Sequence, residues 1–220
     1  MSALTDEQII VLAREAIEAD ARATRAAMES LNETFVKVTR LFASCSGKVL
    51  VTGSGTSGAI AIRAAHLLSV CGTPAFYLSP ADGLHGGLGA LQHNDIVLAV
   101  SKGGSSAELN EFCHRAKSLC GALVAITASV DSSFATLADH VIALRLEADM
   151  DLGTVVATGS SLATAAIVDS LAAVCRIARD YSWDKLLFTH PSGAVGREAG
   201  KSLPSIEVSL AYPSVMSTGN

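Results

Sequence analysis

Five short apolar runs recur between residues 48 and 146, separated by turns and longer segments, and this alternation restricts the fold more than any other feature. The runs are KVLVTG, PAFYLSP, DIVLAVS, ALVAITAS and HVIALRL. Strands that are apolar throughout are typical of parallel sheets buried on both faces. The pattern therefore predicts an α/β fold: a three-layer sandwich whose middle layer is a five-stranded parallel sheet.

Residues 1–46 contain neither glycine nor proline and predict an N-terminal helical arm, broken near Asp20. Large apolar residues recur at spacings of three and four, which places them on one helical face. They are Met28, Leu31, Phe35, Val38 and Phe42. We expect this stripe to pack against its own domain or against a neighbouring subunit. The sheet domain would then occupy residues 47–200, followed by a loosely ordered tail at 201–220.

Composition narrows the range of partners. Half of the residues are hydrophobic, 17% are charged and the net charge is −5, which argues against a nucleic-acid surface. No uninterrupted apolar run approaches the roughly 20 residues of a membrane span, and the N-terminus lacks a signal peptide's segments. Five cysteines without a CxxC pair favour reduced thiols over disulfides or zinc. We expect a cytoplasmic protein with no nucleic-acid or membrane partner.

Two turns that follow predicted strands combine glycines, hydroxyls and the start of a helix. They are Thr52-Gly53-Ser54-Gly55-Thr56-Ser57 and Ser101-Lys102-Gly103-Gly104-Ser105-Ser106. Ligands bind beyond the carboxyl ends of parallel strands, and a helix start offers free N–H groups to a phosphate. Helix capping alone also explains such hydroxyls. Because two such turns leave one sheet, we favour an anion site.

The first turn is not a convincing nucleotide site. GSGTSG keeps the spacing of the dinucleotide motif, but the next strand ends in Ser79-Pro80 where an acid should hold a ribose. The GK[ST] of a Walker loop is missing too. We therefore expect no cofactor and no resident metal.

Four stretches, VLVTGSGTSG, GTPAFYLSPADGLHGGLG, DIVLAVSKGGSSAEL and THPSGAVGRE, resemble in this order the sugar isomerase (SIS) domain, a flavodoxin-like or Rossmann-like fold. LHGGLG and HPSGAVGR are similar, more narrowly, to D-arabinose 5-phosphate isomerases, in a single-domain form without CBS modules. The resemblance spans residues 48–198. It implies that Ser54, Ser101 and Ser106 hold a sugar phosphate with the N–H groups of Gly103 and Gly104. The candidate substrate-binding residues are Gly53, Ser54, Thr56, Ser57, Ser101, Lys102, Gly103, Gly104, Ser105 and Ser106.

The resemblance also places His85 and His190 on the two histidines of the isomerase pattern, the second usually in a neighbouring subunit's site. An imidazole titrates near neutral pH and can open a sugar ring or move protons between oxygens. A hydrogen-bonded structural role is the alternative for both.

Two positions depart from the isomerase pattern: Thr56 replaces a lysine of the first turn, and Ser105 replaces a glutamate of the second. Lys102 either restores a positive charge or is simply solvated. The base that removes a proton next to the carbonyl could come from the acidic loop of Glu147, Asp149 and Asp151. Asp149 is the preferred match. Glu108 begins a helix, where a carboxylate can simply complement the dipole.

These residues support an aldose–ketose isomerase of a phosphorylated or similarly anionic sugar. It would work through a cis-enediol, without cofactor, on a substrate other than D-arabinose 5-phosphate. We expect a homo-oligomer, a tetramer, with sites shared between subunits. The alternative is a SIS domain that senses a sugar phosphate without catalysis. The two histidines favour the enzyme, because a sensor does not need them.

Overall fold

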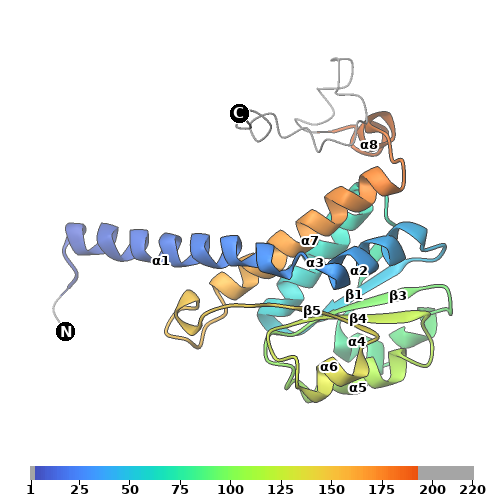
Figure 1. Cartoon of the computed structure of the whole chain (residues 1–220), viewed down its shortest axis with the longest axis horizontal. Helices are drawn as coiled ribbons and strands as arrows, with labels where there is room; N and C mark the ends of the chain where they lie inside the picture. Colours follow the sequence, from blue (N-terminus) through green and yellow to red (C-terminus); the bar gives the residue numbers. More distant parts are fainter. Residues whose placement is uncertain (1–2, 193–220) are drawn as a thin grey trace.

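The computed structural model describes residues 3–192, and its centre is a parallel sheet of five strands in the order β2-β1-β3-β4-β5 (Figure 1). The strands are β1 Val49–Gly53, β2 Ala75–Tyr77, β3 Ile96–Val100, β4 Ala122–Thr127 and β5 His140–Ala143. All neighbouring pairs are parallel. The predicted five-stranded parallel sheet is therefore confirmed. The candidate tail at 201–220 and the glycine-rich turn after His190 lie outside the described residues.

Helices cover both faces of the sheet, which gives the three layers (Figure 1). On one face lie α2 Glu33–Ser44, α3 Gly55–Val70 and α7 Gly159–Ala178. On the other lie α4 Pro80–Leu84, α5 Ala107–Ala116 and α6 Ser133–Leu137. The short helix α8, Trp183–Thr189, follows α7, and single 3-10 turns occur at η1 Ala27–Ser30, η2 Gly87–Ala90 and η3 Ala148–Met150.

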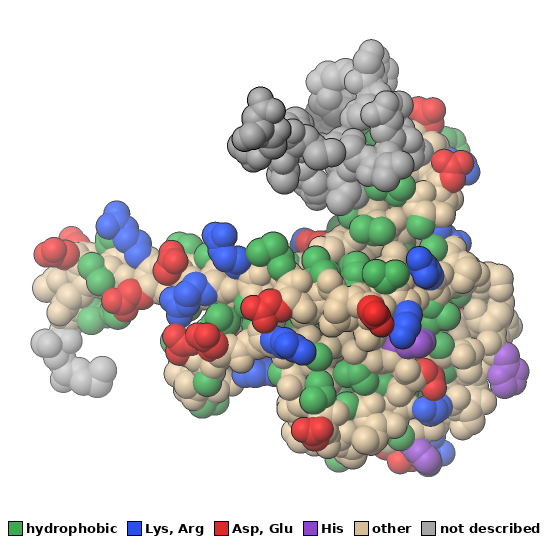
Figure 2. Space-filling model, viewed as in Figure 1, with side chains coloured by type: hydrophobic (Ala, Val, Ile, Leu, Met, Phe, Trp, Pro, Cys, Tyr) green, Lys and Arg blue, Asp and Glu red, His purple; other side chains and the backbone are tan. Residues whose placement is uncertain are grey.

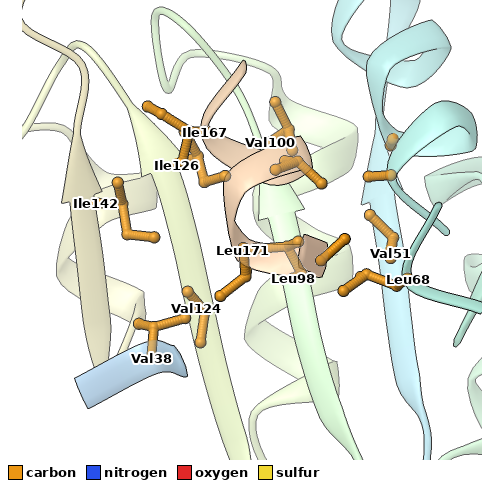
Figure 3. Packing of buried hydrophobic residues seen from close by; sticks show 14 of the residues in the cluster. Val38, Val51, Leu68, Leu98, Val100, Val124, Ile126, Ile142, Ile167 and Leu171 are labelled. Atoms are coloured by element: carbon orange, nitrogen blue, oxygen red, sulfur yellow. The ribbon is translucent and has the colours of Figure 1, made fainter. Parts of the chain in front are cut away.

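Successive strand residues point to opposite faces, so the sheet separates two hydrophobic cores. Toward α7, side chains of β1, β3, β4 and β5 pack against Ile167 and Leu171, with Leu68 and Val38 completing the layer (Figure 3). Toward α5, the alternate strand residues pack against Leu109 and Phe112. Burial on both sides explains why the three central strands β1, β3 and β4 are mostly apolar, while the edge strands β2 and β5 are only partly buried.

The central helix α7 has 20 residues and is the one helix within residues 3–192 that is long and apolar enough, by length and composition, to cross a membrane. Half of it is buried within this domain, and it contacts α1, α2 and α3 as well as the core. Burial among these helices is one sufficient reason for its apolar sequence.

The N-terminal arm differs from the sequence expectation in where it breaks. Helix α1, Asp6–Ala26, begins with a capping box at Thr5 and runs unbroken past Asp20. The chain turns only at Leu31, and Asn32 caps the start of α2. The predicted stripe from Met28 to Phe42 is therefore not one helical face, because the helix is interrupted between Ser30 and Glu33.

The break divides the predicted stripe into a buried and an exposed part. Phe35, Val38 and Phe42 of α2 are buried in the domain's own core. Met28 and Leu31 are 60% and 46% exposed. The stripe thus belongs mainly to the domain itself and carries no argument for association.

Another apolar surface lies on α1. Every residue from 6 to 18 is exposed, and this part of the helix projects beyond the sheet domain (Figure 1). Hydrophobic side chains are spread along it (Figure 2). They include Ile9, Ile10, Val11, Leu12 and Ile17. A helical segment of this length without packing is marginally stable in water, so a covering partner would stabilise it. The homo-oligomer stays a prediction, and α1 replaces the stripe as its expected interface.

We expect Ile10→Glu/Ile17→Glu, on one face of α1, to weaken self-association without lowering the melting temperature of the sheet domain. Each large apolar side chain contributes about 1.5–3 kcal/mol when it is fully buried between subunits. Light scattering and calorimetry would measure the two effects. Glu15→Gln, exposed on the opposite face of the same segment, is the control. Unchanged association of the double variant would contradict this role of α1.

Candidate functional site

The candidate site lies at the point where the order in which strands are added to the sheet changes direction. From β1 the strand order runs outward to β2 on one side and to β3, β4 and β5 on the other. Such a switch point leaves a crevice at the carboxyl ends of the two central strands. Gly53 at the end of β1 lies beside Val100 at the end of β3. Both glycine turns leave the sheet here, so the structure brings them together as expected.

The first turn leaves a hydroxyl group free. Ser54 occupies the N-cap position of α3 but makes no capping hydrogen bond. Its Oγ is buried and has no hydrogen-bond partner within the described residues. A buried hydroxyl without a partner is destabilising, so a ligand that accepts its proton would remove that cost. Gly55, next along the turn, has φ +57°, which favours glycine.

A pocket of about 410 Å³ opens beside this turn. Gly53, Ser54 and Gly55 form one side, while Tyr77, Ser79 and Glu108 line it from neighbouring elements. The Tyr77 hydroxyl donates to the Gly53 carbonyl at 3.3 Å. Burial, with the Asp82 charge adding to it, raises the pKa of Tyr77, so this hydroxyl keeps its proton. The pocket thus combines hydroxyl groups with one carboxylate, a set that suits a polyhydroxylated ligand.

The second turn is held by its own hydrogen bonds. Ser101 Oγ accepts from the Gly104 N–H at 3.1 Å, and Asn110 Nδ2 donates to the Gly104 carbonyl at 3.2 Å. Gly104 has φ +63°, and a Cβ there would collide with Ser132. Ser106 Oγ accepts from the Leu109 N–H at 3.4 Å and caps α5. This turn is therefore preformed, and two of its hydroxyls already serve the fold.

Of the ten candidate substrate-binding residues, Gly53 and Ser54 line this pocket, whereas Thr56, Ser57 and all six candidates of the second turn lie outside its lining. Thr56 is exposed in the first turn of α3, and Ser57 beside it is half-buried. Gly103 and Ser105 are exposed at the tip of the second turn. Their roles stay predictions.

The two aspartates of the acidic loop have different surroundings. Asp149 pairs with Arg22 of α1 at 3.1 Å, and its side chain is 67% exposed. Asp151 is buried and pairs with Lys102 of the second turn. Sequence reasoning preferred Asp149, yet Asp151 is the acid that reaches a turn. No local signal separates two aspartates in one loop, because the partner is distant in the sequence. Tyr77 was also missed, although it ends a strand, where ligands bind.

The two histidines do not line the pocket of their own chain. His85 is exposed at the end of α4. His190 lies past α8, after α7, which rises about 30 Å away from the turns over its length. His190 Nδ1 lies 2.9 Å from the Leu186 carbonyl, which can only accept, so Nδ1 is the donor in this contact. His190 is remote from the turns of its own chain, and its expected role in a neighbouring subunit's site stays a prediction.

No group of three or more potential metal ligands occurs in the described part of the chain. The fold and its two turns define a class of protein: an α/β domain whose two glycine turns leave the sheet side by side at its switch point. Within that class, a family model of the SIS domain matches residues 42–174, and the chain belongs to this family.

Relatives narrow the comparison. Arabinose 5-phosphate isomerase GutQ of Salmonella typhimurium is 33% identical over 168 residues, 76% of this chain and 52% of that protein. The chain thus spans about half the length of the curated relatives it matches. A candidate sugar-phosphate isomerase of Listeria monocytogenes has a TM-score of 0.82 at 29% identity, covering 86% of this chain and 100% of its own. A protein of Escherichia coli CFT073 in complex with arabinose 5-phosphate has a TM-score of 0.81 at 24% identity over the same shares.

The free hydroxyl of Ser54 gives a sharp test. Ser54→Ala should leave the melting temperature unchanged or higher, but weaken sugar-phosphate binding by about 1–3 kcal/mol. Ser106→Ala should also lower stability, by about 0.5–2 kcal/mol, because it removes a helix cap. Scanning calorimetry measures the melting temperature, and titration calorimetry with a panel of sugar phosphates and the matching free sugars measures affinity. Equal affinity of the wild type for the sugar phosphate that it binds and for the matching free sugar would refute an anion site.

The shape of the second turn gives another. Gly104→Ala should weaken sugar-phosphate binding and lower stability, because its φ and the Ser132 contact exclude a side chain. Gly103→Ala is the matched control: its Cβ would meet only Ser105 Oγ, at 3.7 Å. Thermal melts and binding titrations of both variants decide the point. Equal behaviour of the two would mean that the turn is not a rigid cradle.

Proposed function

We propose that this protein is a sugar-phosphate aldose–ketose isomerase that needs no cofactor. The observation that carries the proposal is the pocket at the switch point, where the unpartnered hydroxyl of Ser54 and the carboxylate of Glu108 line one cavity. The family membership and the names of the relatives support the same reaction class.

Glu108 is our candidate for the base within one chain. It lines the pocket, and it forms no ion pair with any other residue between 3 and 192. It would take the proton from the carbon beside the carbonyl, leaving an enediol, and return it to the former carbonyl carbon. Asp149 is paired with Arg22 and lies outside the lining of this pocket, which makes it the weaker candidate in this arrangement.

Protons must also move between the two sugar oxygens. Assembly into a homo-oligomer, for which a tetramer is our proposal, would bring His190 of a neighbouring subunit to this crevice. His85 would act from the loop after α4. Both histidines can open the ring or exchange these protons. Thr56 and Ser105, in place of a lysine and a glutamate, lead us to propose a substrate other than D-arabinose 5-phosphate.

A sensor of sugar phosphates is the second candidate. It is favoured by one observation: none of His85, His190 and Asp149 lines the pocket of its own chain. A binding protein would need only the two turns and the pocket. Catalysis must therefore be measured directly.

The decisive measurement is NMR in D₂O with a panel of pentose and hexose phosphates. We expect the wild type to exchange the C2 proton of one of them and to form the isomer. Glu108→Gln should lower this rate by about 10²–10⁴-fold, the usual contribution of a general base, with little change in affinity. Glu111→Gln, one turn along α5 and paired with Arg115, is the control.

Binding without any exchange by the wild type would replace the isomerase with the sensor. A fully active Glu108→Gln variant would return the role of the base to Asp149.

A further inference from the structure

Two buried aspartates pair with lysines at opposite ends of the strands, and we call the two pairs the amino-edge pair and the carboxyl-edge pair. Asp95 pairs with Lys48 at 2.6 Å near the amino ends of the strands, and Asp151 pairs with Lys102 near the carboxyl ends. The carboxylate side chains are 1% and 5% exposed, and the lysine side chains are 33% and 39% exposed. A buried carboxylate is costly unless it is paired, so each pair needs an explanation.

The amino-edge pair is explained by the fold. Asp95 directly precedes β3 and accepts N–H groups from Lys48, at 2.9 Å, and Gln92, at 2.8 Å. Lys48 directly precedes β1, the strand that pairs with β3. Asp95 thus joins the starts of the two central strands, far from the turns.

The carboxyl-edge pair is only partly explained in this way. Asp151 Oδ1 accepts the Ser160 N–H at 2.8 Å, in the first turn of α7. Thr158, the N-cap residue, makes no capping bond, so Asp151 complements this helix start. Burial alone would raise the pKa of Asp151, but the hydrogen bonds from Lys102 and Ser160 hold it below its usual value. The capping role of Asp151 does not require a lysine from the second turn.

Lys102 is held at both its backbone and its side chain. Its carbonyl accepts from the Ala128 N–H at 3.0 Å and from Thr127 Oγ1 at 3.1 Å. It is the one lysine or arginine in the two glycine turns. An ammonium has three donors, and Asp151 is its single side-chain partner in the described structure. Two N–H groups therefore remain available beside a turn that already presents hydroxyls and a helix start.

We propose that Asp151 is a positioning residue that holds the Lys102 ammonium beside the second turn, where its free N–H groups bind the anionic group of the substrate. The identity of that substrate rests on the proposed function. Anion binding by the pair does not, because inorganic phosphate can test it alone. In the opposing interpretation, the pair only ties the second turn to α7.

The test compares the two pairs in the full chain. Lys102→Met and Asp151→Asn are measured beside the matched controls Lys48→Met and Asp95→Asn, with inorganic phosphate and arabinose 5-phosphate as probes. All four variants should melt at a lower temperature. Only Lys102→Met and Asp151→Asn should weaken phosphate binding, by about 10- to 100-fold for Lys102→Met. Lys102→Arg should restore part of the affinity, and the salt dependence of binding should be shallower in Lys102→Met.

The proposal is overturned if the carboxyl-edge variants only melt earlier and keep wild-type affinity and salt dependence. Should Lys102→Met not fold, Lys102→Met/Asp151→Asn leaves no lone buried charge and provides the same comparison. Phosphate binding that depends on Lys102 in a protein without C2 exchange supports this proposal and rejects the isomerase. Normal isomerisation with an unchanged KM in Lys102→Met rejects this proposal and keeps the isomerase.

Discussion

The parallel pairing of β1 with β3 is the contact on which the rest of the site depends. Its register sets Gly53 opposite Val100, so two turns that are separated by nearly fifty residues start side by side. Because the chain leaves β1 toward one edge and β3 toward the other, no crossover covers the gap between them. The pocket opens at the carboxyl end of β1, where the first turn, the end of β2 and the start of α4 line it together with Glu108 of α5. The order of the strands creates this crevice, and the side chains that line it set its chemistry.

The two turns differ in how far the fold has used their polar groups. In the second turn, the Ser101 and Ser106 hydroxyls accept backbone N–H groups, and Asn110 fixes the Gly104 carbonyl. In the first, Ser54 Oγ is buried without a partner. A preformed cradle beside an unsatisfied donor is the arrangement expected where a ligand completes the hydrogen bonding, since rigid donors lose little entropy on binding. Helix capping alone explains the second turn but not the first.

Local patterns made the sheet predictable, and distant contacts made part of the site unpredictable. The central strands β1, β3 and β4 are mostly apolar because both of their faces are buried, and this pattern can be recognised within a few residues of sequence. The break of the arm at Leu31 is not visible, since spacings of three and four continue across it. Asp149 and Asp151 are equally acidic in one loop, but one meets Arg22 and the other Lys102. Arg22 lies in α1 and Lys102 in the second turn, and each meets its aspartate only because the tertiary fold packs these segments beside the acidic loop.

For the proposed reaction, the crevice must hold two negative charges at once, a basic carboxylate and a phosphate. If Glu108 is the base, its charge repels the phosphate of the sugar. Positive charge therefore has to lie near the phosphate while the base stays unpaired. Helix starts provide partial positive charge at the turns. Lys102 would add a full charge, and its carboxylate partner is itself stabilised by the N-terminus of α7. Because Asp151 is buried and held by the Ser160 N–H, it fixes the Lys102 ammonium more firmly than a surface pair of two flexible side chains would. The other N–H groups of the ammonium are then left for a ligand.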